Sequence, residues 1–140
     1  MKRQRRESGS ALIEFSGALI LLATLLTGIF EIGYTLYSYE NLVHAVRAGA
    51  RYAALGARES GGDPEFAKAV RNLVVYGDPK PAPQAKPIAP GFSPEHVDLV
   101  LEPGQATVSL RGFTIDALFR KIPLNGRPLV TFPIVSGGSR

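Results

Sequence analysis

One stretch decides the fold of this chain: GSALIEFSGALILLATLLTGIF, residues 9–30. Its only ionisable side chain is Glu14, and the other residues are apolar or small. At about 1.5 Å per residue these 22 residues span roughly 33 Å as a helix, enough to cross the hydrocarbon core of a bilayer. The apolar region of a cleaved secretory signal is shorter, about 7–15 residues. The stretch therefore favours a transmembrane helix over a secretory signal.

The excess positive charge of the chain lies just before this helix. Residues 1–9 hold four basic residues and one acid, whereas the other 131 residues hold 12 basic and 11 acidic groups. A basic segment ahead of an apolar helix indicates a cytoplasmic N-terminus under the positive-inside rule. Because no other part of the sequence forms a basic patch, we expect contact with membrane lipid and none with nucleic acid.

The helix is predicted to continue far beyond Phe30, so that one helix covers residues 10–56. No proline occurs before Pro64, and Gly56 is predicted to end the helix. Apolar residues recur at alternating steps of three and four, which is a heptad-like pattern that invites partner helices. The stripe consists of Leu22, Leu25, Ile29, Ile32, Leu36, Tyr39, Val43, Val46, Ala50 and Ala53.

Residues 57–140 are expected to form a small α+β head. Asp63-Pro64-Glu65 is a typical helix start, and the apolar spacing that follows predicts an amphipathic helix over 64–76, ended by Gly77. Residues 78–94 hold six prolines and are expected to form a linker or surface loop with no core of its own.

The C-terminal part of the head is predicted to contain a short antiparallel sheet. Alternating residues indicate strands at 97–102 and 106–111, joined by a turn at Pro103-Gly104. The helical spacing of Ile115, Leu118, Phe119 and Ile122 predicts a short helix. The last strand, 129–135, contains Pro133, which predicts either an edge strand or a bulge.

Catalytic chemistry has little support in the sequence. There is no cysteine, and the two histidines, His44 and His96, lie in different segments. No metal-binding, phosphate-binding or nucleophile-elbow motif is present. We therefore expect no enzyme activity, no metal and no cofactor.

Glu14 is the residue that needs an explanation. A lone carboxylate costs about 2.5–3.5 kcal/mol at the centre of a membrane helix, and less near its edge. The simplest interpretation is an acid that reaches the cytoplasmic interface. Alternatively, a cut after Gly9 would give Ser10 a free ammonium four residues before Glu14. That pair would form within one subunit or between neighbours and would favour one stagger between subunits.

The N-terminal residues resemble a known family. Gly9, separated by four residues from Glu14-Phe15, resembles the prepilin peptidase site of class III signal sequences. The wider match, which includes Ala48-Gly49-Ala50-Arg51-Tyr52-Ala53, resembles the TadE-like pilins or pseudopilins of tight-adherence systems, which are related to type IV pili. The first 54 residues carry nearly all of this resemblance.

The resemblance implies a pilin-like structural subunit, made as a single-pass precursor in the bacterial inner membrane. A prepilin peptidase would remove the leader, residues 1–9, so that Gly9 and Ser10 flank the cut. Glu14 would register neighbouring subunits, with Ser10 as partner amine and Phe15 beside it. Other subunits and the assembly platform of the inner membrane would be its partners.

The size of the head favours a minor pilin or pseudopilin in a surface filament or at its base. Two alternatives remain: a major filament subunit, and an uncut membrane-anchored adhesin or scaffold.

Overall fold

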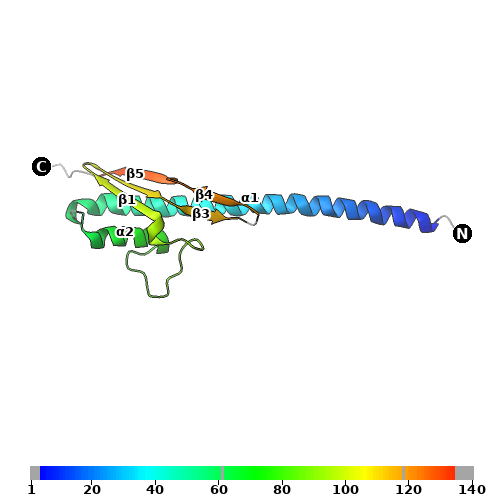
Figure 1. Cartoon of the computed structure of the whole chain (residues 1–140), viewed down its shortest axis with the longest axis horizontal. Helices are drawn as coiled ribbons and strands as arrows, with labels where there is room; N and C mark the ends of the chain where they lie inside the picture. Colours follow the sequence, from blue (N-terminus) through cyan, green and yellow to red (C-terminus); the bar gives the residue numbers. More distant parts are fainter. Residues whose placement is uncertain (1–3, 61, 118, 135–140) are drawn as a thin grey trace.

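The computed structural model describes residues 4–60, 62–117 and 119–134. Its central element is one long helix, α1 (Gln4–Ser60), along whose C-terminal half the head packs, while the N-terminal half extends away bare (Figure 1). At 57 residues this helix is roughly 85 Å long. The expected α+β class, with a long N-terminal helix and a small head, is confirmed.

The helix is longer at both ends than the sequence suggests. It begins at Gln4, within the basic segment, and continues through Gly56 to Ser60. The prediction that Gly56 ends the helix is wrong. A β-carbon placed on Gly56 would lie only 2.5 Å from Cε2 of Phe66, so this glycine makes room for an aromatic ring of the next helix.

The second helix, α2 (Pro64–Tyr76), has the predicted bounds and caps. The backbone N–H of Glu65 donates to Oδ1 of Asp63 (3.0 Å), which satisfies one of the free donors of the first turn. At the other end Gly77 adopts φ 75°, a left-handed conformation, and its N–H donates to the carbonyl of Leu73 (2.9 Å).

Three strands form the main sheet of the head, in the order β1-β2-β5 and antiparallel throughout. Their bounds are β1 (Val97–Glu102), β2 (Gln105–Leu110) and β5 (Leu129–Pro133). The β1–β2 hairpin turns at Pro103-Gly104, which places Glu102 opposite Gln105. Strand β5 lies at an edge of the sheet, which confirms the first of the two alternatives that Pro133 predicted.

A second hairpin replaces the short helix predicted around Ile115 and Ile122. Strand β3 (Phe113–Asp116) pairs with β4 (Lys121–Leu124), and Ile115 lies directly opposite Ile122. Leu118, part of the same prediction, lies outside the described residues. The helix prediction failed because a seven-residue separation also brings two residues together across a tight hairpin.

The core of the head is built around α1, with the main sheet on one side of this helix and α2 on another (Figure 1). Four α1 residues on one face are completely buried, namely Leu42, Val46, Ala50 and Ala53. Val70, Val74 and Val75 of α2 and Ala106, Val108 and Leu110 of β2 pack in the same core. The long helix is therefore an integral part of the head.

The proline-rich loop contributes more than expected. The N–H of Ile88 donates to the carbonyl of Val75 (2.9 Å), and Ala89 and Phe92 are buried in the core. The loop has no core of its own, as expected, but its C-terminal end packs into the core of the head. The short 3-10 helix η1 (Pro94–His96) then leads into β1, and the His96 ring packs against Phe92 and Phe113.

Candidate assembly and membrane surface

The long helix has two surfaces of different character. From Gly9 to Phe30 every residue is exposed except the half-buried Thr27, and these residues are predominantly apolar. From Leu42 to Ala54, by contrast, one face is buried under the head. Within the described part of the chain, α1 is the helix that is long and apolar enough to cross a membrane. The bare apolar half supports a membrane-anchored protein.

The predicted helix-packing stripe divides between these two surfaces. Val46 is fully buried inside the head and Val43 is half-buried. This end of the stripe therefore packs within the chain itself. The remaining stripe is free for a neighbour, and it consists of Leu22, Leu25, Ile29, Ile32 and Leu36, all exposed. Packing of these five residues against other subunits stays a prediction.

The residues of the predicted processing and registration site lie together near the start of α1. Gly9, Ser10, Glu14 and Phe15 are all helical and exposed. Ser10 and Glu14 are four residues apart and therefore share one face of the helix. No described side chain forms an ion pair with Glu14, so its carboxylate remains available to a group from outside the described fold.

The bare half of the helix contains glycines at positions 17, 28 and 33, without any break in the helix. A β-carbon at any of these glycines would meet nothing within 4 Å. By contrast, Gly49 faces α2, and a β-carbon there would collide with Cγ2 of Val74. The glycines of α1 therefore have two settings: open positions on the bare half, and close helix–helix contacts under the head.

The tip of the β3–β4 hairpin reaches the helix where its bare half begins (Figure 1). The backbone N–H of Phe119 lies 3.4 Å from Oε1 of Glu31, the first charged residue after Glu14. Arg120 and Glu31 line one cavity of about 370 Å³. No local pattern in the sequence indicates this contact, because the spacing around Phe119 predicts a helix and not a hairpin tip.

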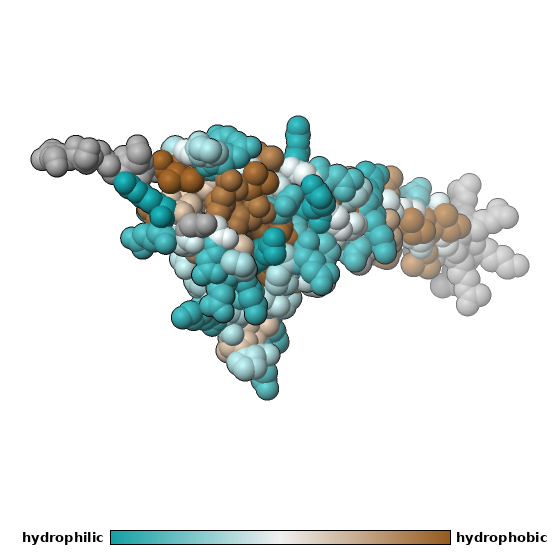
Figure 2. Space-filling model, turned by 60° about the vertical axis from the view of Figure 1, so that its left-hand side comes forward, coloured by the Kyte–Doolittle hydropathy of each residue, from teal (hydrophilic) through white to brown (hydrophobic). Residues whose placement is uncertain are grey.

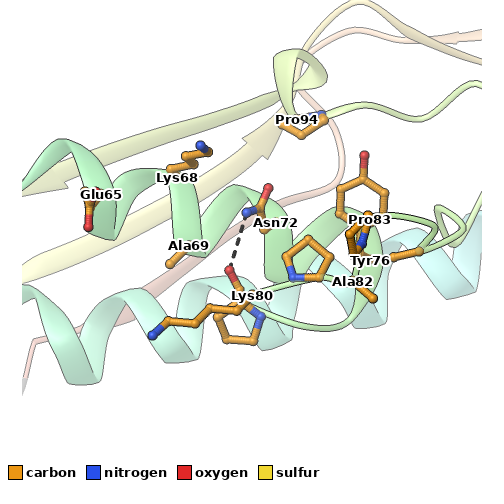
Figure 3. Close-up of a pocket in the computed structure, with 12 residues that line it drawn as sticks. Glu65, Lys68, Ala69, Asn72, Tyr76, Lys80, Ala82, Pro83 and Pro94 are labelled. Carbon is orange, nitrogen blue, oxygen red and sulfur yellow. Dashed lines mark hydrogen bonds between the residues drawn. The ribbon is translucent and has the colours of Figure 1, made fainter.

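A shallow groove lies between α2 and the proline-rich loop (Figure 3). It measures about 570 Å³ and includes Lys68, Tyr76 and Lys80. The side-chain amide of Asn72 donates to the carbonyl of Pro79 (3.4 Å) and ties the loop to the helix. The groove thus has two lysines and no nucleophile–base pair, which gives it no catalytic arrangement. Among the described residues, no group of three or more His, Asp or Glu is placed to hold a metal ion.

The surface of the head is mixed. Seen towards its distal end, it shows a hydrophobic area framed by hydrophilic residues (Figure 2). The outward face of the main sheet is largely polar: Thr107 and Thr131 share a hydrogen bond (2.9 Å), and Arg111 pairs with Asp98 (3.2 Å). Such exposed pairs contribute little stability. Most of the exposed large apolar side chains among the described residues therefore belong to the bare half of α1.

Comparison with known proteins bears on this helix and not on the head. Residues 9–51 match the family model described as TadE-like protein. No curated protein and no solved structure matches the chain. The matched segment begins at the glycine of the predicted processing site and ends within the part of α1 that the head buries.

Proposed function

Since residues 9–51 form a TadE-like segment, and since this family indicates a pilin-like protein of a tight-adherence pilus, we propose that the chain is a minor pilin or pseudopilin of such a pilus or secretion system. In this proposal a prepilin peptidase cuts the precursor after Gly9, and the mature subunit assembles through its N-terminal helix. The observation that carries the proposal is the bare apolar half of α1, joined without interruption to the core of the head.

The exposed stripe supports assembly. Residues such as Leu25 and Leu36 are more than half exposed, and a large apolar surface is unstable in water. In the precursor, lipid covers the part of this surface up to Phe30. In the assembly, the equivalent helices of other subunits cover the whole stripe. Heptad-like spacing suits the second environment, because it keeps one seam facing a neighbour along the helix.

The position of Glu14 supports a role for processing. Before the cut, no described side chain pairs with its carboxylate, which lies near the cytoplasmic end of the membrane helix. After a cut behind Gly9, the new ammonium of Ser10 lies one helical turn away or is offered by an adjacent subunit. Because separating buried opposite charges is expensive, such pairing favours one stagger between subunits.

Orientation follows from the charge distribution. The basic residues before the helix favour a cytoplasmic N-terminus, which places the head on the outer side of the inner membrane. The partners are then the peptidase, other pilin or pseudopilin subunits, the assembly platform and membrane lipid. The proposed mechanism involves processing, release from the membrane and helix packing, and no catalysis.

Two measurements on cells that express the system test this proposal. The first is the mass of the chain with and without the prepilin peptidase, and we expect the peptidase to remove residues 1–9. A product that starts at Met1 in both cases would instead support an uncut anchored adhesin or scaffold.

The second measurement is the amount of the chain in sheared surface filaments. We expect it to be present at far lower abundance than the principal subunit. An abundance equal to that of the principal subunit would identify it as the major subunit and overturn the minor role.

A further inference from the structure

We propose that the tip of the β3–β4 hairpin is a second membrane contact, and that Phe119 inserts into the lipid that surrounds α1. This inference rests on the proposed function only in that α1 crosses a membrane. The predicted processing site lies far from the hairpin. Of the predicted packing stripe, Ile32 and Leu36 line a cavity with Arg120 and Ile122 of the hairpin.

The first argument is position along the helix. Phe119 is held beside Glu31 by the 3.4 Å contact of its backbone N–H. Glu31 directly follows Phe30, at the end of the stretch that can span the hydrocarbon core. When this stretch crosses a bilayer, the hairpin tip is at the level where the helix leaves the lipid.

The second argument is continuity of the apolar surface. Phe119 lines a cavity of about 540 Å³ together with Ile20, Ala23, Thr24, Thr27, Gly28 and Glu31 of α1. Most of these residues belong to the membrane stretch itself. Lipid that covers this side of α1 therefore also meets Phe119, because no other described element separates them.

The third argument is the chemistry of the tip. Phe119 is 73% exposed, the largest exposed fraction among the large apolar side chains of the head that the structure describes. Arg120 and Lys121 follow it, both exposed, and Lys121 pairs with Asp116 (3.8 Å). An apolar ring followed by two long cationic side chains suits the boundary between acyl chains and headgroups, where the ring enters the acyl region and the charges stay in water.

Two contacts with the membrane would restrict the head more than one. A single helix leaves the head free to tilt and to rotate above the bilayer. With the hairpin tip also in contact, one side of the head faces the lipid. Release of the subunit into an assembly then requires withdrawal of both α1 and Phe119 from the membrane.

The test uses the absence of tryptophan from this chain, which makes any introduced tryptophan a unique reporter. The full chain carrying Phe119→Trp is reconstituted, at low protein density, in phosphatidylethanolamine–phosphatidylglycerol vesicles with and without lipids brominated near the headgroup end of the acyl chain. We expect a blue-shifted emission and a loss of intensity with brominated lipid.

Two matched variants calibrate this measurement. Ile29→Trp lies in the membrane stretch and should be quenched, whereas Leu55→Trp, on the same helix but roughly 36 Å beyond Glu31, should not. Circular dichroism melting curves like that of the parent chain establish that each variant is folded.

The outcomes separate the two proposals. Quenching of Ile29→Trp without quenching of Phe119→Trp overturns the hairpin contact and leaves the membrane helix intact. If Ile29→Trp is not quenched either, the membrane-spanning helix itself is wrong. If the emission of Phe119→Trp responds to protein density and not to bromine, the tip contacts a second copy of the chain, which also overturns the lipid contact.

Discussion

Gly49 of α1 and Val74 of α2 approach so closely that no side chain fits on the glycine. A β-carbon there would collide with Cγ2 of Val74, which is completely buried. Seven residues further along α1, Gly56 faces Phe66 in the same way. These two glycines set the distance between the helices, so the head depends on missing side chains as well as on buried ones.

We expect Gly49→Ala to destabilise the head. Overpacking of a well-filled core costs about 1–3 kcal/mol, and the better helix propensity of alanine recovers about 1 kcal/mol, which leaves a net loss of up to about 2 kcal/mol. Denaturant unfolding of the full chain in detergent, followed by circular dichroism, measures this loss.

The matched control is Gly33→Ala, the same substitution in the same helix with nothing within 4 Å. It should leave stability unchanged or slightly raised. Val74→Ala should partly relieve the defect of Gly49→Ala in the double variant. Equal effects of both glycine substitutions would contradict the close contact.

Asp63→Ala should weaken the start of α2. The substitution removes the acceptor for the N–H of Glu65, and loss of such a cap typically costs about 1 kcal/mol. Asp63→Asn keeps an oxygen acceptor in the same place and should retain most of the stability. Thermal melting of the three proteins gives the comparison. If asparagine destabilises as much as alanine, the hydrogen bond is not the cause.

Val46→Ala and Leu36→Ser should separate folding from assembly. Val46 is fully buried, and removal of its two methyl groups should cost about 2 kcal/mol of stability. Leu36 is 58% exposed, so its replacement should leave the melting curve unchanged and lower the amount of subunit recovered in filaments. Normal recovery of Leu36→Ser would remove this residue from the proposed packing surface.

Replacement of Gly9 by valine should block processing. A bulky, β-branched side chain directly before the proposed cut removes the small residue that the peptidase site resembles. Mass spectrometry of the membrane fraction should then find only the uncut chain, whereas Gly17→Val, at an equally open position of α1, should be cut normally. Unchanged cutting of the Gly9 variant would move the site elsewhere.

Glu14→Leu should insert and be cut normally but should not enter the assembly. Leucine is favourable in lipid, so insertion is not impaired, while the charge proposed to register subunits is lost. Glu14→Gln keeps the shape and hydrogen-bonding capacity without the charge, and we expect it to fail as well. Normal recovery of either variant in sheared filaments would show that the negative charge is dispensable.

The sequence predicts the parts of this fold that depend on local chemistry. Helix α2 has the expected bounds because Asp63, Pro64 and Gly77 each act on backbone groups within a few residues of themselves. The β1–β2 hairpin follows in the same way from alternating residues around Pro103-Gly104. Likewise, the long helix is recognisable because a long apolar stretch without proline has few alternatives to a helical conformation.

The errors occur where the deciding partner is distant in the sequence. Gly56 has the composition of a helix end, but its partner is the ring of Phe66 on another helix. Ile115 and Ile122 have helical spacing, but they meet across a hairpin. The proximity of Phe119 to Glu31, 88 residues apart, requires the packing of the whole head and has no local signature.

The union of head and helix also has a consequence for the geometry of an assembly. Because Leu42, Val46, Ala50 and Ala53 are at once helix residues and core residues, the head cannot swivel about α1. Any array that fixes the rotation of this helix about its own axis therefore fixes the azimuth of the head. In a fibre, the helix contacts buried at the centre of the fibre would then determine which face of the head points outward.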